Sequence, residues 1–418
     1  MISTVPGSSG AGLPQGGGAR LVIFVAFLGL FLSGYNNFML PLALIKLTPA
    51  FKLSAWQNGE LLAATFLGML LGGAIFGRLA DVLGRKRAMI VNMLIIAACA
   101  IATGFVTGPE QLLTLRLILG IGIGGGYPIG SSYVADIAQN HHRGSRMTLA
   151  FSGWGFGALA AGLIGWAMLT MLPANQGWRW MLASGAIPAI AALAVIAFLK
   201  MPESHAWKHA STLDPLSTRA LFSPAHRRLT IAALLPWFLM DLPVYGIGLL
   251  TPTLLTELGI GKANMVVAAT CGLAALTLAG FLTAFHLIDT LGRRRLQMTG
   301  FFGMAVLFTI LALGVGHFNK WPILGLFAII QIFINAGPNT TTWIVPAELF
   351  PTRLRATGQG SATAFSRIGA ASGAFFLPVL NAHSGPAAAF LLVAAASALA
   401  LWLTYVYLPE TARTDLMH

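Results

Sequence analysis

Long apolar runs constrain this chain more than any other feature of its sequence. Of its 418 residues, 56% are hydrophobic and only 9% are charged, whereas a typical soluble protein has about 25% charged residues. A helix needs about 20 apolar residues to cross the hydrocarbon core of a bilayer, and runs of that length recur along the chain. The pattern predicts a membrane protein with many spans. It excludes a soluble enzyme, a nucleic-acid binder and a secreted disulfide scaffold.

The apolar runs predict an all-α membrane protein with twelve transmembrane helices. The expected spans are 21–47, 58–80, 88–107, 111–139, 147–172, 179–200, 229–257, 263–289, 296–316, 321–349, 357–382 and 386–408. A polar stretch at 201–228 is expected to be a cytoplasmic linker between two six-helix bundles, 20–200 and 229–408. Residues 1–19 are expected to form a disordered tail rather than a secretory signal, and residues 409–418 a C-terminal tail.

Basic residues are distributed unevenly between the two ends of the predicted spans. Most Lys and Arg residues of the loops fall on one side, which also carries both termini. Because Lys and Arg collect on cytoplasmic loops, we expect cytoplasmic termini and a multi-pass protein of the plasma membrane. The net charge of +13 then has a topological origin and does not indicate a nucleic-acid partner.

Three motifs occur once within or directly after each predicted bundle, with their copies about 210 residues apart. The loop 81–87, Asp-Val-Leu-Gly-Arg-Lys-Arg, returns at 289–295 as Asp-Thr-Leu-Gly-Arg-Arg-Arg. The other pairs are Pro202-Glu203-Ser204 with Pro409-Glu410-Thr411, and Ala135-Asp136 with Ala347-Glu348. Repetition at nearly one offset predicts two similar bundles related by an axis along the membrane normal.

The repeated motifs resemble signatures of the major facilitator superfamily over residues 20–412. The two Asp-x-x-Gly-Arg-Lys/Arg-Arg loops are similar to its strongest motif, and Arg116 followed by Gly120, Gly122 and Gly124 is similar to its span-4 motif. The Pro-Glu-Ser and Pro-Glu-Thr endings resemble its sugar-porter-like branch. The resemblance implies a major facilitator fold of two pseudo-symmetric six-helix bundles, which exposes a central site alternately to each side of the membrane.

Other stretches resemble particular carriers of that branch. Segments 237–246 and 338–353 look closest to phosphate:proton symporters, whereas 367–369 is more similar to bacterial organic-acid:proton symporters. The chain also departs from both groups. Gly126 stands where phosphate symporters have an acid, and Asn36 stands where organic-acid carriers have an Asp. The acids expected in spans 1 and 4 are therefore absent or neutral.

Asp241 is the acidic residue that lies well inside a predicted span. A charge at mid-membrane costs about 2.5–3.5 kcal/mol, and burial favours the neutral, protonated carboxyl. Trp237, Asp241 and Tyr245 are spaced four residues apart, so they share one helix face near the midplane. A carboxyl that gains and loses a proton as access switches would couple transport to protons. The alternative is a structural carboxyl that is paired with Arg or bonded by hydroxyls.

Amides and a second buried charge provide further candidates for binding the solute. Gln331, Asn335 and Asn339 repeat the four-residue spacing and could bind an anion or a sugar, or join helices. Pro338 is expected to interrupt their helix. Arg367 could clamp a carboxylate or phosphate, or form a salt bridge to Asp241 or Glu348. The predicted substrate site comprises Asn36, Tyr127, Ser152, Trp237, Asp241, Tyr245, Gln331, Asn335, Asn339 and Arg367.

The resemblance implies that the cytoplasmic motifs act as gates. Asp81 and Arg85 are expected to cap a helix end and bridge to Asp136 or the opposite half, and Glu348 to pair with Arg353 or Arg355. The alternative is an orientation signal alone. Arg116 is expected to lie near the start of its span, where its side chain could extend outward to water. The predicted gating residues are Asp81, Arg85, Arg116, Asp136, Asp289, Arg293, Glu348 and Arg353.

The sequence as a whole predicts a secondary active transporter. We expect proton-coupled symport of a small anion, either phosphate or an organic acid; the alternatives are a porter of sugars or other neutral solutes, a proton-coupled exporter and a transporter-like sensor. The chain has no Walker motif and no nucleophile–base or metal constellation, so no enzymatic activity, metal or cofactor is expected. Cys99 and Cys271 are expected to pack in the interior. The expected partners are a small polar solute, protons and the lipid bilayer, with the protein a monomer.

Overall fold

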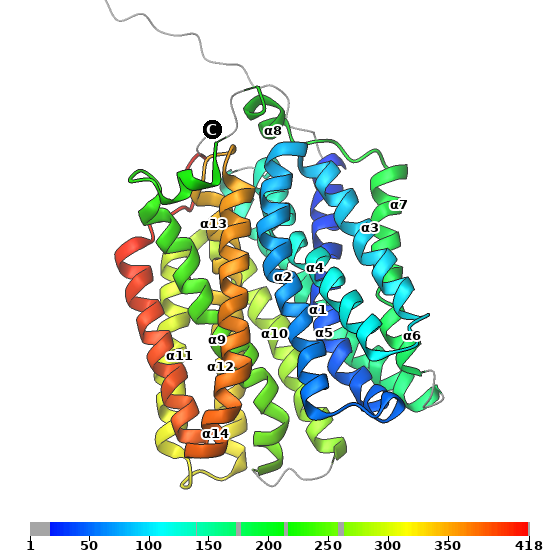
Figure 1. The fold of residues 1–418 in the computed structure, drawn as a ribbon. Coiled ribbons are helices and arrows are strands. Elements are labelled where there is room, and N and C mark those ends of the chain that lie inside the picture. Colours follow the sequence, from blue (N-terminus) through cyan, green and yellow to red (C-terminus); the bar gives the residue numbers. More distant parts are fainter. Residues whose placement is uncertain (1–16, 139, 173–176, 213–215, 258–262, 417–418) are drawn as a thin grey trace, which may run out of the picture.

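The computed structural model describes residues 17–138, 140–172, 177–212, 216–257 and 263–416. Over these residues it contains helices and no strand. The first half of the chain, blue to green in Figure 1, stands beside the second half, green to red. The start of α1 (Gly17–Phe51), helix α8 (His205–Ala210) and the C-terminal end lie at one end of the bundle. We refer to this end as the cytoplasmic end, following the charge distribution.

Seven α-helices in the described residues make up the first half. After α1 come α2 (Ala55–Leu83), α3 (Arg85–Thr103), α4 (Pro109–Ile137), α5 (Arg143–Met171), α6 (Gly177–Ala183) and α7 (Ala186–Phe198). The 3-10 helix η1 (Asn140–His142) precedes α5. The expected linker contains α8 and the 3-10 helix η2 (Thr218–Phe222).

The second half contains fewer but longer α-helices. They are α9 (Arg227–Glu257), α10 (Ala263–Leu291), α11 (Arg293–Gly314), α12 (Lys320–Ala336), α13 (Pro338–Leu349) and α14 (Arg355–Tyr407). Helix α14 has 53 residues, about twice the length that a bilayer requires.

The expected set of twelve spans is confirmed. Ten helical segments of the described residues are long and apolar enough to cross a membrane. Among them is α14, which supplies two spans because Gly385 turns the backbone between them with φ 77. Only glycine adopts that conformation readily, and Pro386, which lacks an N–H, follows it. Helix α10 accounts for the remaining span.

Several helix ends differ from the predicted ones by up to one turn. The expected tail reached residue 19, but α1 begins at Gly17; residues 1–16 lie outside the described part of the chain. Asp81 and Arg85, expected in a loop, stand on α2 and α3, which are separated only by Gly84. The physical reason is that an apolar run marks the crossing of the hydrocarbon layer, whereas a helix continues into the headgroup region.

Two predicted spans are interrupted. The expected span at 179–200 is divided into α6 and α7 around Gly185. The expected span at 321–349 is divided into α12 and α13 at Gly337, immediately before Pro338. This second interruption confirms the prediction for Pro338, whose ring cannot continue the hydrogen-bond ladder of the preceding turn.

The two halves contact each other through small residues on α2 and α14. A Cβ atom added at Gly77 would lie 2.6 Å from the backbone oxygen of Ala356, and one added at Gly73 would lie 3.0 Å from that of Gly360. Backbones can approach this closely only where side chains are absent. The glycines therefore allow α2 and α14 to pack tightly across the boundary between the halves.

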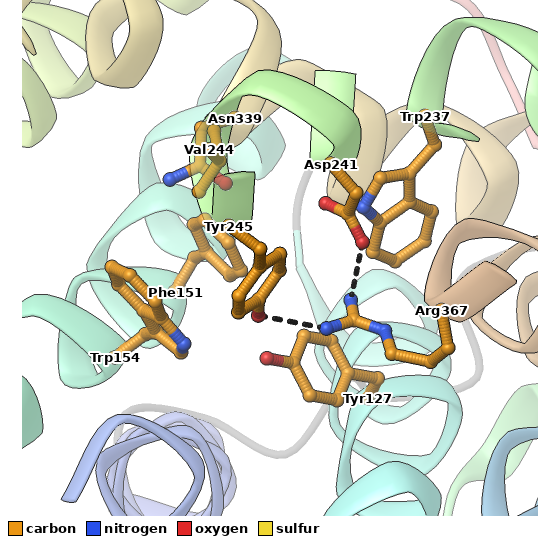
Figure 2. Close-up of a pocket in the computed structure, with 9 residues that line it drawn as sticks. All are labelled: Tyr127, Phe151, Trp154, Trp237, Asp241, Val244, Tyr245, Asn339 and Arg367. Atoms are coloured by element: carbon orange, nitrogen blue, oxygen red, sulfur yellow. Dashed lines mark hydrogen bonds and ion pairs between the residues drawn. The ribbon is translucent and has the colours of Figure 1, made fainter. Parts of the chain in front are cut away.

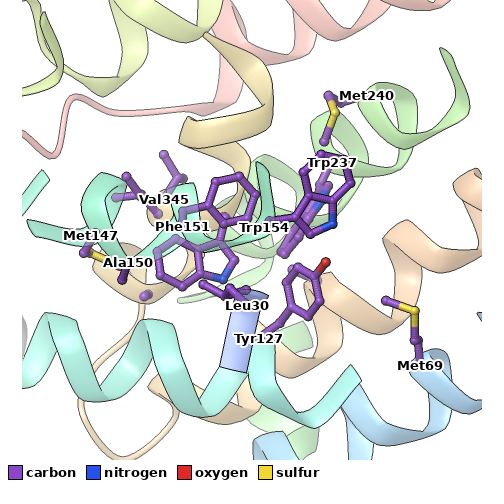
Figure 3. Close-up of a cluster of buried hydrophobic side chains, with 14 of the residues drawn as sticks. Leu30, Met69, Tyr127, Met147, Ala150, Phe151, Trp154, Trp237, Met240 and Val345 are labelled. Atoms are coloured by element: carbon purple, nitrogen blue, oxygen red, sulfur yellow. The ribbon is translucent and has the colours of Figure 1, made fainter. Parts of the chain in front are cut away.

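Buried side chains from both halves meet at the centre of the molecule. Figure 3 shows Leu30, Tyr127 and Trp154 from the first half around Trp237 and Val345 from the second. Cys99 is buried and free, as expected of a packing residue, whereas the side chain of Cys271 lies outside the described residues. The outer surface carries large apolar side chains such as Phe302 and Leu313, as a lipid-facing surface requires.

Candidate functional site

A small enclosed cavity lies between the two halves. It is lined by Tyr127, Phe151 and Trp154 of the first half and by Trp237, Asp241, Val244, Tyr245, Asn339 and Arg367 of the second. Figure 2 shows these side chains converging from α4, α5, α9, α13 and α14. The cavity measures about 10 Å³, which is room for about one water molecule. The structure is therefore closed around its central site.

The centre of this site is a buried ion pair between two helices of the second half, α9 and α14. Nη2 of Arg367 on α14 lies 3.2 Å from Oδ2 of Asp241 on α9. Nη1 of the same guanidinium donates a hydrogen bond of 2.8 Å to the hydroxyl of Tyr245. Asp241 and Arg367 are each 2% exposed. The pair can persist at this depth because each charge compensates the other.

Aromatic rings surround the guanidinium of Arg367. Its central carbon lies 5.0 Å from the ring centroid of Tyr127, 5.5 Å from that of Tyr245 and 5.9 Å from that of Trp237. These distances are within the range of cation–π attraction. Tyr127 is held in turn by a hydrogen bond of 2.8 Å between its hydroxyl and that of Ser33 on α1. Arg367 is thus oriented by residues of both halves.

The predicted helix face on α9 is present. Trp237, Asp241 and Tyr245 all line the cavity, as their four-residue spacing indicated. Asp241 and Arg367 also form the salt bridge that the sequence left as one alternative. The sequence did not identify Phe151, Trp154 or Val244 as lining residues, because single apolar residues in an apolar span carry no signal of their own.

Of the three amide side chains spaced four residues apart on α12 and α13, only that of Asn339 reaches the cavity. Asn339 lines the cavity, and its Nδ2 donates to Oδ1 of Asn335 at 2.7 Å. Nδ2 of Asn335 donates to the backbone oxygen of Gln331 at 2.8 Å. The side chains of Asn335 and Gln331 do not line the cavity. Asn335 therefore orients Asn339 from behind.

Two further predicted residues lie away from the cavity in this conformation. Oγ of Ser152 donates to the backbone oxygen of Leu149 at 2.7 Å, and Nδ2 of Asn36 donates to that of Leu32 at 2.9 Å. Each side chain thus bonds its own helix, and neither lines the cavity. Their place in a substrate site stays a prediction.

Arg116 lies near the start of α4, as expected, but its side chain does not extend outward to water. Its side chain is fully buried, and none of its three guanidinium nitrogens has a hydrogen-bond partner among the described residues. The expectation that it extends outward was wrong, because α4 is packed against α1, α2 and α3 and leaves no path to water. It also stands apart from the other predicted gating residues, which lie at the cytoplasmic end.

The cytoplasmic end of the first half carries a group of buried ion pairs that we call the first charge cluster: Asp81, Arg85, Asp136 and Arg355. Arg85 pairs with Asp81 at 2.8 Å and with Asp136 at 3.1 Å. Arg355, which comes from the second half, also pairs with Asp136. Arg85 further donates from Nη2 to the backbone oxygen of Thr352 in the second half, at 3.1 Å. These contacts match the predicted bridge to Asp136 and to the opposite half.

An equivalent group, the second charge cluster, consists of Asp289, Arg293, Glu348 and Arg143. Arg293 pairs with Asp289 at 2.9 Å and with Glu348 at 2.9 Å. Arg143, from the first half, pairs with Glu348 at 2.7 Å. The predicted partners of Glu348, Arg353 and Arg355, were therefore wrong. The two halves exchange arginines, so that each acid at the end of α4 or α13 receives one from the opposite half.

The same clusters also cap helices across the boundary. Asp81 accepts hydrogen bonds of 2.7 Å from both the backbone N–H and the hydroxyl of Thr357 at the start of α14. Asp289 accepts bonds from the N–H groups of Gly144 and Ser145 at the start of α5, at 3.0 and 2.8 Å. A carboxylate at a helix N-terminus satisfies free N–H groups and interacts favourably with the helix dipole. The sequence missed Arg143, although Arg143 and Arg355 repeat at the same offset as Asp136 and Glu348.

Two tightly paired bundles around one closed, polar central site define a membrane transporter of the alternating-access type. The Major Facilitator Superfamily model matches residues 26–286, and the model for sugar and other transporters matches residues 208–418. The chain therefore belongs to the major facilitator superfamily, and it is a multi-pass membrane transporter.

Similar proteins include bacterial and plant transporters. YaaU of Escherichia coli (strain K12) is 30% identical, over 92% of this chain and 90% of that protein. The inner membrane metabolite transport protein YgcS of the same organism is 29% identical, over 91% and 88%. Inorganic phosphate transporter 1-11 of Oryza sativa subsp. japonica is 28% identical, over 79% and 72%.

Among solved structures, the proton:xylose symporter XylE from E. coli shares the fold. It superposes with a TM-score of 0.83 at 20% sequence identity, over 95% of this chain and 97% of that chain. The likeness confirms the predicted major facilitator fold, and the match of residues 208–418 to the model for sugar and other transporters confirms the predicted sugar-porter-like branch.

Proposed function

We propose that this transporter is a proton-coupled symporter of a small anion, either inorganic phosphate or an organic acid. The observation that carries the proposal is the enclosed ion pair between Asp241 and Arg367, 3.2 Å apart. Each charge of a buried pair becomes costly when the other is removed. Protonation of Asp241 would therefore leave Arg367 without a counter-charge, and a substrate anion would replace the lost carboxylate.

This arrangement links the proton to the solute. The anion binds well only when Asp241 is protonated, and Asp241 stays protonated more readily when the anion neutralises Arg367. Two ligands that favour each other in this way have a positive coupling free energy, which is reciprocal. The site with proton and anion bound then has the same net charge as the empty site. In either case the protein can pass through the closed state without an uncompensated charge in the membrane interior.

The residues around Arg367 fit the recognition of an oxyanion. A guanidinium can bind two oxygens of a phosphate or carboxylate side by side. The hydroxyl of Tyr245, 2.8 Å from Nη1 of Arg367, and the amide of Asn339 lie on the same cavity and can donate to further oxygens. The names of related proteins, a phosphate transporter and a metabolite transport protein, support a small polar solute.

The two charge clusters are proposed as the cytoplasmic gate. The ion pairs and helix caps join both halves at that end, while the central cavity is too small for a solute. Opening to the cytoplasm must separate Arg143 from Glu348 and Arg355 from Asp136. We place this gate and both termini in the cytoplasm of a cell with the transporter in its plasma membrane, because most basic residues gather there.

A second candidate function is supported by the amides. Asn339 lines the cavity and is oriented by Asn335, and a carboxamide can donate to and accept from sugar hydroxyls. A sugar or another neutral polar solute would leave the Asp241–Arg367 pair intact and bind beside it. The two candidates therefore differ in whether the ion pair opens when substrate binds.

Uptake into proteoliposomes with an imposed pH gradient tests the proposal. Labelled phosphate and labelled mono- and dicarboxylates serve as substrates, and unlabelled anions and sugars as competitors. We expect accumulation of at least one anion when the outside is acidic, with competition by other anions and none by sugars. Sugar uptake that anions do not affect would contradict the anion proposal and favour the second candidate. Empty liposomes and the exposed-residue variant Lys208→Gln are the controls.

A further inference from the structure

The loops that join α2 to α3 and α10 to α11 have the same construction. Each turns at a glycine in the left-handed region, Gly84 with φ 98 and Gly292 with φ 90. The first N–H group of each following helix donates a hydrogen bond to a glutamate that follows the last span of the same half. Glu203 accepts from the N–H of Arg85 at 3.0 Å, and Glu410 accepts from the N–H of Arg293 at 2.8 Å.

The space beside these two loops is filled in the first half and open in the second. Trp207 of α8 donates from Nε1 to the backbone oxygen of Asp81 at 2.8 Å, and its ring lies 3.2 Å from where a Cβ of Gly84 would stand. By the offset that relates Glu203 to Glu410, the residue equivalent to Trp207 is Thr414. The three atoms nearest to a Cβ placed at Gly292 all belong to the carboxyl group of Glu410, and no aromatic ring is among them.

A cavity of about 310 Å³ occupies the position in the second half that the indole fills in the first. Three arginines contribute to its lining, Arg294 and Arg295 from the start of α11 and Arg413 from the C-terminal turn. The complete lining is Asp289, Thr290, Leu291, Gly292, Arg294, Arg295, Glu410, Ala412 and Arg413. Its volume is enough for a phosphate group together with part of a lipid headgroup.

The two acids of this cavity are already engaged. Glu410 accepts from the N–H groups of Arg293, Arg294, Thr411 and Ala412. Asp289 pairs with Arg293 and caps α5. Arg294, Arg295 and Arg413, by contrast, form no ion pair with the described residues. Within the described part of the chain, the cavity therefore holds three arginines without an ion pair against one carboxylate without an ion pair, that of Glu410, and its net charge is positive.

The cavity also lies at the level of the membrane surface. Arg294 donates from Nη2 to the backbone oxygen of Tyr405 at 2.7 Å, and its guanidinium lies 5.5 Å from the tyrosine ring. Tyr405 and Trp402 are 62% and 54% exposed on the outer surface of α14. Exposed Tyr and Trp near the ends of spans are typical of the headgroup layer. A lipid of the cytoplasmic leaflet is thus the nearest source of an anionic phosphate.

We propose that the cavity between the α10–α11 loop and the C-terminal turn binds the phosphate of an anionic phospholipid through Arg294, Arg295 and Arg413. The site is separate from the central cavity and does not depend on the transported solute. Clusters of basic residues beside a span on its cytoplasmic side are suited to such headgroups. In the first half Trp207 fills the equivalent space, so we expect one such site for each chain.

Native mass spectrometry of the full chain tests this proposal. The detergent-purified protein is incubated with mixed micelles of phosphatidylcholine and phosphatidylglycerol, and retained lipid is counted. The variant Arg294→Gln/Arg295→Gln/Arg413→Gln should lose one retained phosphatidylglycerol, with affinity falling about fivefold for each arginine removed. Phosphatidylcholine retention should not change. The matched control is Lys86→Gln/Arg87→Gln, which changes the equivalent loop positions of the first half.

A second variant fills the cavity without removing any of its arginines. Thr414→Trp places an indole where the first half has Trp207, and it should displace the retained phosphatidylglycerol with all three arginines present. Equal retention in the triple variant and its control, or an equal loss in both, would overturn the proposal. Displacement of the lipid by millimolar inorganic phosphate would instead show a site for free anions, and would overturn the assignment to a lipid.

Discussion

At the cytoplasmic end, the two halves of this transporter contribute equivalent residues. Each half supplies an acid and an arginine where α2 meets α3 or α10 meets α11, and a second acid at the end of α4 or α13. Each half also supplies an arginine that pairs with an acid of the opposite half. At the centre, the halves differ. By the offset that relates Asp81 to Asp289, Asp241 corresponds to Ser33. By the offset that relates Asp136 to Glu348, Arg367 corresponds to Gly155, and Asn339 to Tyr127.

The comparison separates two tasks. The end that must close between two bundles uses the same chemistry twice, whereas the charged residues that line the central cavity, Asp241 and Arg367, belong to the second half only. The first half contributes a neutral wall there, including Tyr127, whose hydroxyl is held by Ser33 at 2.8 Å. We therefore expect substitutions at the centre to act asymmetrically between the halves, and substitutions at the cytoplasmic end to act symmetrically.

The largest effect is expected for Arg367→Gln. Removing one partner of a buried ion pair costs about 3–5 kcal/mol, and the variant also loses the cation that the proposed anion needs. Uptake of labelled anion into proteoliposomes should be abolished while the purified protein remains folded by circular dichroism. The control is the exposed-residue variant Lys208→Gln, which should keep its uptake. Anion uptake that survives Arg367→Gln would contradict anion binding by the guanidinium.

Asp241→Asn should separate transport from its energy source. The amide cannot lose a proton, so uptake should no longer follow the imposed pH gradient. Exchange of labelled for unlabelled anion across the same membrane should persist, because exchange needs no net proton movement. The exposed-residue variant Lys208→Gln is the control and should leave pH-driven accumulation in place. Undiminished proton-driven accumulation by Asp241→Asn would refute the coupling role.

The cytoplasmic end should respond alike to either exchanged arginine. Arg143→Gln and Arg355→Gln each remove a charged hydrogen bond, worth about 1.5–3 kcal/mol, while Glu348 keeps Arg293 and Asp136 keeps Arg85. Each variant should populate the cytoplasm-open state more, measured by double electron–electron resonance between spin labels on the cytoplasmic ends of the two bundles. Lys208→Gln is the control. A shift in one variant only would break the expected symmetry.

Ser33→Ala should have the smallest effect. It removes the hydroxyl partner of Tyr127, a neutral hydrogen bond worth about 0.5–1.5 kcal/mol, and leaves every charge of the central site in place. We expect the apparent affinity for the anion to weaken by roughly three- to tenfold, with the pH dependence of uptake unchanged. A change in pH dependence would mean that the first half takes part in proton coupling.

The fold and part of the central site could be predicted from the sequence. Apolar runs predicted the spans, repeated motifs predicted two similar bundles, and spacing by four placed Trp237, Asp241 and Tyr245 on one face. Such inferences succeed because they depend on periodicity within one helix or on repetition along the chain. The interruption before Pro338 was predictable for the same reason, since it depends on the covalent geometry of a single residue.

Contacts between helices were the part that the sequence did not reveal. The pairing of Arg143 with Glu348 depends on how the bundles face one another, and no local pattern contains that information. The burial of the Arg116 side chain was not predicted, because depth along a span says nothing about which helices surround it. The aromatic rings around Arg367 come from α4 and α9, which are distant from α14 in sequence, so their convergence requires the folded structure.

The exchanged arginines also bear on how the chain is synthesised. Arg355 follows its partner Asp136 by 219 residues, and Glu348 follows Arg143 by 205. At a ribosomal rate of roughly 5–20 residues per second, the first bundle waits about ten to forty seconds for these partners. During that interval Arg143 lacks its partner Glu348, and Asp136 has Arg85 but lacks Arg355. The ion pairs that join the two bundles at the cytoplasmic end can therefore form only after the second bundle has been synthesised, so assembly of this transporter ends with docking between two inserted bundles.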